Sequence, residues 1–257
     1  MKTMILCGGI GTRMKEETEF KPKPMVLIGG KPILWHVMKI YAHYGYNEFV
    51  LALGYKGDMI KDYFLNQKAL SSDFTLNTST NEIKFHTNEF DNFIITFADT
   101  GLESLTGERI LRTKKYISED EFMITYGDGV ADIDIKELVA FHQKSGTIGT
   151  ITGVHPYSKY GLIKIDEGGR DLIEEFNQKP LMREYVSGGF MVFKRRFFDY
   201  LDEGPMEEAI KKLTQEKQIS VYKHKGFFKG MDTYREMEEL NKLWQESRPW
   251  AVWERKK

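Results

Sequence analysis

The sequence predicts an α/β fold in which a mostly parallel β-sheet is flanked by helices. Through the first half of the chain, from Thr3–Cys7 to Ile135–Ser145, short apolar runs alternate with amphipathic stretches. This alternation is typical of parallel strands joined by right-handed helical crossovers. From Gly149 onward the apolar runs follow one another more closely. The second half should therefore be richer in strands.

The first half of the chain should supply most of the parallel strands. Four runs are apolar enough for buried strands: Thr3–Cys7, Glu48–Leu53, Phe93–Ala98 and Glu121–Tyr126. Helical spacing of apolar residues predicts helices from Lys31-Pro32 to Gly45, from Asp58 to about Asn66, from Ser104–Arg109 to about Tyr116, and over Ile135–Ser145. Ser71–Glu89 interrupts this rhythm with weak alternation, and we expect an inserted hairpin or flap there.

The second half should add strands and close with a helix. Strands are expected at Thr150–Val154, Gly161–Ile165, Leu172–Phe176, Tyr185–Phe193 and Ile219–His224, and helices at Phe197–Leu201, Met206–Gln215 and Thr233–Gln245. The tail Pro249–Trp253 is too aromatic to be left in water, so it should dock on the body or on a neighbouring subunit. No repeat, low-complexity tract or linker divides the 257 residues, which indicates a single domain.

Composition excludes several classes of protein. The 37 basic and 38 acidic residues give a formal net charge of -1, which provides no general attraction to nucleic acid or to anionic membranes. Cys7 is the only cysteine, so an internal disulfide is impossible. No apolar stretch approaches the ~20 residues that span a bilayer, and none suits a signal peptide. We therefore expect a soluble, cytoplasmic protein.

The glycine-rich loop Gly8-Gly9-Ile10-Gly11-Thr12-Arg13 follows the first predicted strand. Glycines let backbone N–H groups approach an anion closely, and basic residues such as Arg13 and Lys23 can complete a phosphate site. Dinucleotide-binding loops need a small residue where this chain has Met14. A P-loop needs Ser or Thr after Gly-Lys, but Gly30-Lys31 is followed by Pro32. The loop therefore predicts phosphate binding of another type.

The order of motifs resembles the sugar nucleotidyltransferases, and among them the glucose-1-phosphate cytidylyltransferases. The motifs that carry this resemblance are Gly-Gly-x-Gly-Thr-Arg at Gly8–Arg13, Lys21–Met25, Gly29–His36, Gly54–Gly57, Asp99–Gly101, Leu105–Gly107, Tyr126–Asp132, Gly188–Phe190 and Met231–Thr233. They span nearly the whole chain in order. The resemblance implies a Rossmann-like, mixed and mostly parallel sheet of the nucleotide-diphospho-sugar transferase type, with a β-rich acceptor-side portion. Residues 1–148 would form the nucleotide-binding half, and residues 149–257 the acceptor-binding half with the C-terminal helix and tail.

The resemblance also implies a reaction. CMP would pass from CTP to a phosphorylated acceptor, such as glucose 1-phosphate, with release of pyrophosphate. A phosphate monoester is mostly dianionic near neutral pH because its second pKa is about 6, so no general base is needed. The reaction needs positive charge and positioning instead. Such a sugar nucleotide would serve polysaccharide biosynthesis.

By motif position, the catalytic residues would be Arg13, Lys23 and Asp128. Arg13 would hold the leaving phosphates, Lys23 would neutralise the α-phosphoryl oxygens, and Asp128 with Asp232 would bind Mg²⁺ as cofactor. The nucleotide would be bound by Leu6, Gly8, Gly9, Gly11, Thr12, Arg13, Lys23, Ser104, Thr106, Arg109, Gly127 and Asp128. Arg109 would serve the O2 and N3 acceptors of cytosine. The acceptor would be bound by Gln178, Lys179, Gly188 and Gly189. Asp134 precedes a predicted helix and is expected to cap it rather than to bind metal.

Three residues or segments depart from the family pattern, and two of them leave the acceptor open. Gln178 stands where a glutamate is usual, Glu108 where a glycine is usual, and Glu203–Ala209 is shorter than the family segment and lacks its tryptophan. Of these, Gln178 and Glu203–Ala209 touch the expected acceptor side. A polyol phosphate or an amino-acid phosphate is therefore an alternative acceptor.

Two other functions agree less well with the sequence. A regulatory subunit without catalysis would be free to lose Arg13, Lys23, Asp128 and Asp232, all of which are present. A glycosyltransferase would release no pyrophosphate. The expected partners are small molecules and a homo-oligomeric copy, without nucleic acid or membrane.

Overall fold

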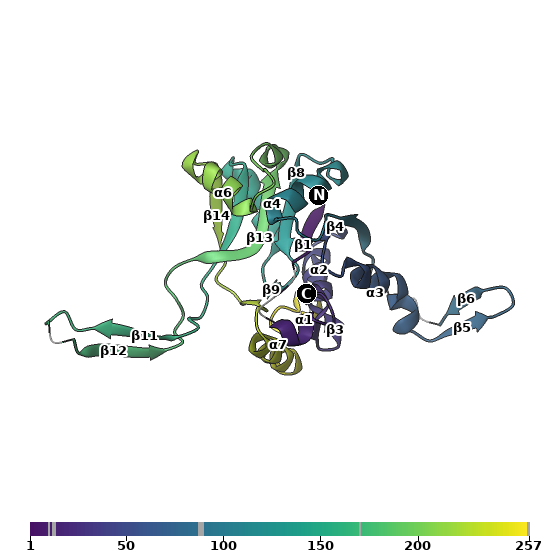
Figure 1. The fold of residues 1–257 in the computed structure, drawn as a ribbon, viewed down its shortest axis with the longest axis horizontal. Helices are drawn as coiled ribbons and strands as arrows, with labels where there is room; N and C mark the ends of the chain where they lie inside the picture. Colours follow the sequence, from purple (N-terminus) through teal and green to yellow (C-terminus); the bar gives the residue numbers. More distant parts are fainter. Residues whose placement is uncertain (10, 12–13, 87–89, 170, 256–257) are drawn as a thin grey trace.

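The computed structural model describes residues 1–9, 11, 14–86, 90–169 and 171–255. Its centre is a seven-stranded sheet in the order β14-β10-β13-β8-β1-β4-β7 (Figure 1). These strands are β1 (Thr3–Cys7), β4 (Glu48–Leu53), β7 (Ile94–Asp99), β8 (Glu121–Tyr126), β10 (Gly149–Val154), β13 (Val186–Lys194) and β14 (Ile219–Lys223). β13 is antiparallel to both of its neighbours, whereas the other adjacent pairs are parallel. The predicted mixed, mostly parallel α/β sheet is confirmed.

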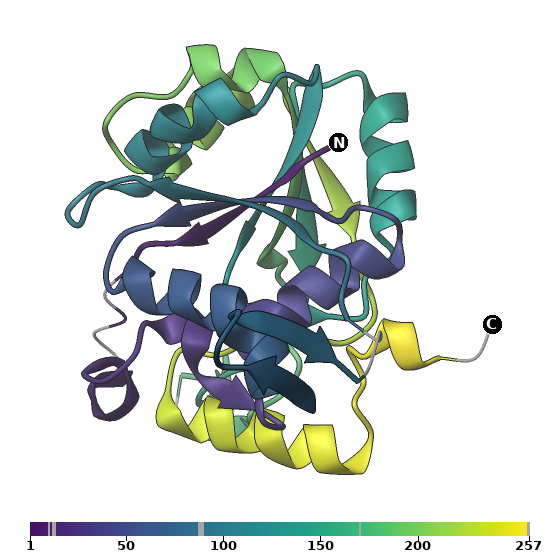
Figure 2. The same ribbon diagram turned by 90° about the vertical axis from the view of Figure 1, so that its right-hand side faces the viewer.

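Helices cover both faces of this sheet (Figure 2). One core cluster joins the sheet to α2 (Ile33–His43), α3 (Gly57–Leu70), α5 (Ile135–Ser145) and α7 (Tyr234–Glu246). The other cluster joins it to α4 (Thr106–Thr113), η4 (Arg195–Asp199) and α6 (Met206–Gln215). Because β1, β4 and β8 are buried between these layers, their sequences are apolar on both faces.

Short elements complete the body. They are α1 (Lys15–Thr18), η2 (Lys23–Met25), η3 (Lys114–Tyr116), η5 (Val252–Glu254), the ribbon of β2 (Leu27–Ile28) with β3 (Lys31–Pro32), and the ribbon of β9 (Gly129–Ala131) with β15 (Phe228–Gly230). The sequence did not predict the β9–β15 ribbon. It pairs Gly129 with Gly230, so the residues just before β9 and just after β15 lie close together.

Two hairpins leave the body as arms on different sides (Figure 1). One arm consists of β5 (Phe74–Asn77) and β6 (Glu82–Phe85), which confirms the hairpin predicted within Ser71–Glu89. The other consists of β11 (Gly161–Ile165) and β12 (Ile173–Gln178). In each arm the strands pair only with each other among the residues described, and almost all of their residues are exposed.

The aromatic tail docks on the body of its own chain. Trp250 is fully buried, stacks on Phe227 and donates a hydrogen bond from Nε1 to Nδ1 of His36 at 3.2 Å. Trp244 and Trp253 pack around the same histidine. The prediction that the tail is covered is thus confirmed.

Two predicted helices differ from their observed form. α3 continues to Leu70, past the expected end near Asn66. The expected helix at Phe197–Leu201 is the 3-10 turn η4, because Phe197 and Phe198 must both reach the core from a short segment. Within the described ranges, no helix is both long and apolar enough to cross a membrane.

Candidate functional site

Two glycine-containing turns lie together beside β1, where the strand order of the sheet reverses its direction. β1 lies between β4 and β8, and the turns after β1 and β8 begin at Gly8 and Gly127. The N–H of Gly127 donates to the carbonyl of Leu6 at 3.2 Å, which ties the two strand ends together. Carboxyl ends of parallel strands at such a switch point are the usual ligand site of open α/β sheets.

A pocket of about 340 Å³ opens at this point, and we call it the glycine-loop pocket. Thr12 and Arg13, two members of the predicted nucleotide set, lie outside the described residues. All ten other members line this one pocket: Leu6, Gly8, Gly9, Gly11, Lys23, Ser104, Thr106, Arg109, Gly127 and Asp128. The pocket is also lined by four residues that sequence reasoning missed, namely Cys7, Pro24, Leu105 and Tyr126. Of these, Tyr126 directly precedes the Gly127-Asp128 motif, which was a usable signal.

Arg109 is 4% exposed and lies beneath the glycine loop. Its terminal nitrogens donate to five oxygens: the carbonyls of Gly8, Leu53, Gly101 and Leu102, and Oγ1 of Thr100, at 2.7–3.2 Å. A side chain at Gly8 or Gly54 would collide with this guanidinium. Arg109 therefore joins the ends of three loops. A direct contact with cytosine stays a prediction, and it would require exchanging at least one of these bonds.

Lys23 brings together the two predicted metal-binding carboxylates. Its Nζ donates to Oδ2 of Asp128 at 2.6 Å and to Oδ1 of Asp232 at 2.7 Å. The lysine side chain is 13% exposed, so these are partly buried ion pairs. Burial alone would lower the pKa of Lys23, but the two carboxylates outweigh it and raise the pKa above its ordinary value. Lys23 is thus a cation near neutral pH.

Secondary structure fixes each member of this triad. Lys23 begins η2, and the adjacent Pro22 and Pro24 restrict its backbone. Asp128 leaves β8, and the N–H of Met231 donates to its carbonyl at 2.9 Å. Asp232 precedes the capping box of α7, where Oε2 of Glu236 accepts from the N–H groups of Asp232 and Thr233 at 2.7 and 2.9 Å.

The carboxylates of Asp128 and Asp232 fit a hard divalent cation. An oxygen of each lies within 2.7 Å of the same nitrogen, so both can reach one bound ion. Over the described part of the chain, no three His, Cys, Asp or Glu side chains gather as a metal site. Mg²⁺ suits this arrangement because it usually takes one or two carboxylates together with substrate phosphates.

The neighbouring aspartates have other partners. Asp134 caps α5 by accepting from the N–H of Glu137, as predicted. Asp132 pairs with His224 and Arg255 and accepts from the N–H of Phe227. Burial would raise the pKa of Asp132, but these partners lower it overall. Asp132 is therefore a structural anion.

A second, smaller pocket of about 130 Å³ adjoins the first, and we call it the β13 pocket. It is lined by Thr125, Tyr126, Asp128, Gly129, Ser187, Gly188, Gly189, Phe228, Gly230 and Asp232. The predicted acceptor residues Gly188 and Gly189 therefore lie beside both carboxylates.

The structure does not bring Gln178 and Lys179 to this pocket. Gln178 ends β12 and Lys179 follows it, so both belong to the arm and line neither pocket. Gln178 is exposed. The expectation that they join Gly188 and Gly189 in one site is not met within a single chain, because the hairpin carries them away from the sheet (Figure 1).

The segment Glu203–Ala209 contacts both sides of the site, since its Glu207 accepts a hydrogen bond from Tyr126, which lines both pockets. The carbonyl of Gly204 accepts from the N–H of Gly107, and Oγ1 of Thr106 accepts from the N–H of Met206. The segment thus packs on the start of α4, against the glycine-loop pocket. Local sequence could not reveal this contact between residues about a hundred positions apart.

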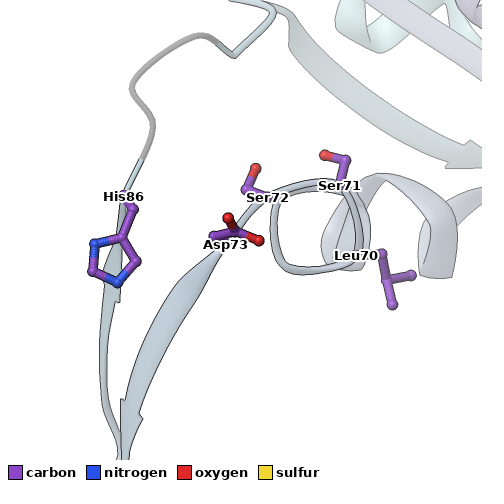
Figure 3. A pocket seen from close by; sticks show the side chains of 5 residues that line it. All are labelled: Leu70, Ser71, Ser72, Asp73 and His86. Carbon is purple, nitrogen blue, oxygen red and sulfur yellow. The ribbon is translucent and has the colours of Figure 1, made fainter.

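A third hollow is unrelated to this site. Leu70, Ser71, Ser72, Asp73 and His86 line it where α3 meets the β5–β6 arm (Figure 3). It shares no lining residue with the other two pockets. Lys23, Asp128 and Asp232 therefore identify the glycine-loop pocket and the β13 pocket as the candidate active site.

Comparison with known proteins points to one family. The family model described as nucleotidyl transferase matches residues 2–245. A probable glucose-1-phosphate cytidylyltransferase of Bacillus subtilis is 43% identical over 98% of this chain and 100% of its own length. The glucose-1-phosphate cytidylyltransferase of Salmonella typhimurium is 40% identical over 99% of this chain and all of its own.

Solved structures agree on the fold. A UDP-glucose pyrophosphorylase in complex with UDP-glucose superposes with a TM-score of 0.68 at 17% identity, covering 96% of this chain and 99% of its own. HddC from Yersinia pseudotuberculosis gives a TM-score of 0.69 at 22% identity, covering 95% of this chain and 99% of its own. These proteins share the architecture of the sheet and its helices.

Proposed function

This chain belongs to the nucleotidyl transferase family, and we propose that it transfers CMP from CTP to glucose 1-phosphate, forming CDP-glucose and pyrophosphate. One observation carries the proposal: the Lys23–Asp128–Asp232 triad adjoins the glycine-loop pocket in a chain at least 40% identical to glucose-1-phosphate cytidylyltransferases over nearly its whole length. We assign CTP to the glycine-loop pocket and the sugar phosphate to the adjoining β13 pocket.

The mechanism follows from the charges. A phosphate oxygen of glucose 1-phosphate attacks the α-phosphorus of CTP in line, and the bond to the β-phosphate oxygen breaks as pyrophosphate leaves. The attacking group is already an anion, so no residue has to remove a proton. The chain's contribution is positive charge and alignment. Lys23 neutralises the α-phosphoryl oxygens, and the N–H groups of the glycine loop bind the phosphates. Arg13 lies outside the described residues, and we propose that it holds the phosphates of the leaving pyrophosphate.

We assign Mg²⁺ as the cofactor, held by Asp128 and Asp232. When bound with the nucleotide, it supplies charge that neutralises crowded phosphate oxygens. The β9–β15 ribbon and the α7 cap support this assignment, because they hold Asp128 and Asp232 near each other. Mn²⁺ titration followed by electron paramagnetic resonance tests the assignment, because free and bound Mn²⁺ give different signals. Unaltered binding in an Asp232→Asn protein would contradict it.

The substrate assignment is tested by pyrophosphate release over a matrix of substrates. CTP, UTP, dTTP and GTP are each paired with glucose 1-phosphate, other hexose 1-phosphates, a polyol phosphate and an amino-acid phosphate. CTP with glucose 1-phosphate should give the highest kcat/KM. Faster reaction with UTP or dTTP would overturn the assignment of CTP as the nucleotide. Faster reaction with a polyol phosphate or an amino-acid phosphate would overturn the assignment of a sugar phosphate as the acceptor. Silence across the matrix would favour a regulatory nucleotide-binding subunit.

We also propose that the protein is a cytoplasmic homo-oligomer, and that its product supplies activated glucose for polysaccharide biosynthesis. The β11–β12 arm supports the assembly, because a lone hairpin is at best marginally stable in water. The arm and the loop between its strands expose six large apolar side chains: Leu162, Ile163, Ile165, Leu172, Ile173 and Phe176. Sedimentation velocity should show a multimer that Ile163→Asp dissociates, with Ile83→Asp on the other arm as control. A monomeric wild-type protein would contradict this proposal.

A further inference from the structure

Tyr126 stands at the junction of the two pockets. It ends β8 and, with Asp128, lines both the glycine-loop pocket and the β13 pocket. Asp128 has a role already, as a carboxylate bound to Lys23. Tyr126 has none in the mechanism above.

The ring of Tyr126 forms part of the wall of the β13 pocket. Gly189 has φ of +77° and faces this ring, and a Cβ at Gly189 would come within 2.8 Å of Cδ2 of Tyr126. Glycine is therefore needed there both for its backbone conformation and for the space that the ring fills. The close fit sets the position of the ring against β13.

The hydroxyl of Tyr126 is held from the other side by Glu207 of α6. It donates to Oε1 of Glu207 at 3.1 Å. Burial and the nearby carboxylate raise the pKa of Tyr126 well above its ordinary value, so the hydroxyl stays a neutral donor. The other carboxylate oxygen of Glu207 lies 3.4 Å from Oγ1 of Thr106, which donates to it.

Glu207 is itself fixed to the nucleotide side of the site. The start of α6 bonds to α4 through the N–H of Met206, which donates to Oγ1 of Thr106 at 2.8 Å. The N–H of Gly107 donates to the carbonyl of Gly204 at 2.9 Å. A side chain at Gly107 would collide with that carbonyl, so the two segments are in close contact. Glu207 thus connects Thr106, at the edge of the glycine-loop pocket, to Tyr126, in the wall of the β13 pocket.

We propose that Tyr126 determines acceptor specificity by packing its ring against the sugar ring of the bound sugar phosphate, and that Glu207 is the positioning residue that fixes Tyr126. An aromatic face offers an apolar, electron-rich surface to the C–H groups of a hexose. A linear polyol phosphate would make poorer contact with it. This inference rests on the proposed function, because it assigns the sugar phosphate to the β13 pocket.

The test is steady-state kinetics of pyrophosphate release with CTP and glucose 1-phosphate. Tyr126→Phe removes only the hydroxyl, and Glu207→Ala removes its acceptor together with the longer contact to Oγ1 of Thr106. Each should raise KM for glucose 1-phosphate by about tenfold, a loss of about 1.4 kcal/mol. KM for CTP should change by less than about twofold. Glu207→Gln keeps a hydrogen-bond acceptor and should restore most of the loss.

Glu208→Ala is the matched control. Glu208 occupies the same helical turn, is exposed and pairs with Lys211 at 2.7 Å. Its loss should leave both KM values unchanged. The double variant Tyr126→Phe/Glu207→Ala should be no worse than Glu207→Ala alone, because Glu207→Ala already breaks the hydrogen bond that Tyr126→Phe removes.

Three results would overturn the inference. They are an unchanged acceptor KM in Tyr126→Phe, equal rises in both KM values, and additive effects in the double variant. A wild-type protein that releases no pyrophosphate from this substrate pair would instead overturn the proposed function, and the inference with it. An active wild-type protein with insensitive variants would overturn only the role of Tyr126.

Discussion

Two carboxylates and one ammonium group lie together at the centre of the site. The ammonium group would compete with a divalent cation for the carboxylates. Lys23 donates to both Asp128 and Asp232, and it occupies the position between them. A divalent ion that bound both carboxylates would have to displace Lys23. Triphosphate would give Lys23 a new anionic partner, so the nucleotide and the metal should bind together.

Lys23→Met should therefore strengthen metal binding without nucleotide. Removing the cation leaves two unneutralised carboxylates, and we expect Mn²⁺ affinity to rise about tenfold, equivalent to about 1.4 kcal/mol. Electron paramagnetic resonance of free Mn²⁺ measures this change. Lys39→Met, which breaks the pair with Asp91 in another part of the fold, is the control. Equal Mn²⁺ affinity in the wild-type and Lys23→Met proteins would show that Lys23 does not compete with the metal ion for the carboxylates.

Asp128→Asn should abolish turnover while leaving the fold intact. The substitution keeps size and removes charge, and the loss of one preorganised electrostatic contact costs on the order of 10²–10³ in rate. Circular dichroism checks the fold, and pyrophosphate release measures the rate. Asp134→Asn is the matched control, because asparagine also caps helices and Asp134 lies at the α5 N-terminus. A rate within about threefold of wild type would remove Asp128 from the metal site.

Much of the site could be predicted at the level of residues, because its motifs are local. Gly8, Gly9, Gly11, Gly127 and Asp128 follow strands that the sequence predicts, and they line one pocket with Lys23 as expected. The hydrogen bonds of Arg109 could not be predicted, because they join three loops that are distant in sequence. The contact of Glu207 with Tyr126 could not be predicted for the same reason, although Glu207 lies within the segment Glu203–Ala209 that the sequence assigns to the acceptor side.

At the scale of elements, helix α7 acts as a support for the site. Its capping box places Glu236 against the N–H groups of both Asp232 and Thr233. Oγ1 of Thr233 accepts from the N–H of Glu236 at 3.3 Å. Loss of the cap would free the turn that carries Asp232.

Thr233→Ala should lower the free energy of unfolding by about 1 kcal/mol, the usual effect of losing an N-cap side chain. It should also weaken Mn²⁺ binding, because Asp232 precedes the cap directly. Urea unfolding and Mn²⁺ titration measure the two effects. Thr214→Ala is the control, since that hydroxyl is exposed and donates to the carbonyl of Ile210 within α6. Lost stability with unchanged metal affinity would separate the cap from the metal site.

The elements with strong local patterns were predicted well. β1, β4, β8 and α5 have the predicted bounds, because continuous apolar runs and helical periodicity identify them. The β9–β15 ribbon was not predicted, because it pairs three-residue segments about a hundred positions apart without any local alternation. That ribbon brings Asp128 to Asp232.

At the scale of the whole molecule, the sequence predicts the layers but not how the arms leave the body. The strand order and the antiparallel β13 arise from pairings between distant segments. Gln178 and Lys179 match a family motif, yet the structure puts them on an arm away from Gly188 and Gly189. A motif identifies residues of a family, and the tertiary path of the chain decides which of them meet.

The buried histidine that joins the tail to the body should make stability depend on pH. His36 is fully buried, and its Nε2 lies 2.8 Å from the carbonyl of Ile28. Burial, assisted by Lys31, lowers the pKa of His36 from 6.5 to about 4. Between these values the unfolded chain binds a proton at His36 and the folded protein does not. The contribution of neutral His36 to the free energy of unfolding is therefore fully present above pH 6.5. It is lost as the pH falls to about 4, which lowers the free energy of unfolding by up to about 3 kcal/mol.

Urea unfolding at pH 7 and pH 4.5, followed by fluorescence of Trp244 and Trp250 beside this histidine, measures the effect. His36→Gln should be less stable at pH 7, because its polar contacts change, but it should lose less stability on acidification than wild type. His86→Gln on the exposed β5–β6 arm should lose as much as wild type. An equal loss in the wild-type and His36→Gln proteins would assign the pH dependence to other groups, with buried His142, whose pKa burial also lowers, as the next to replace.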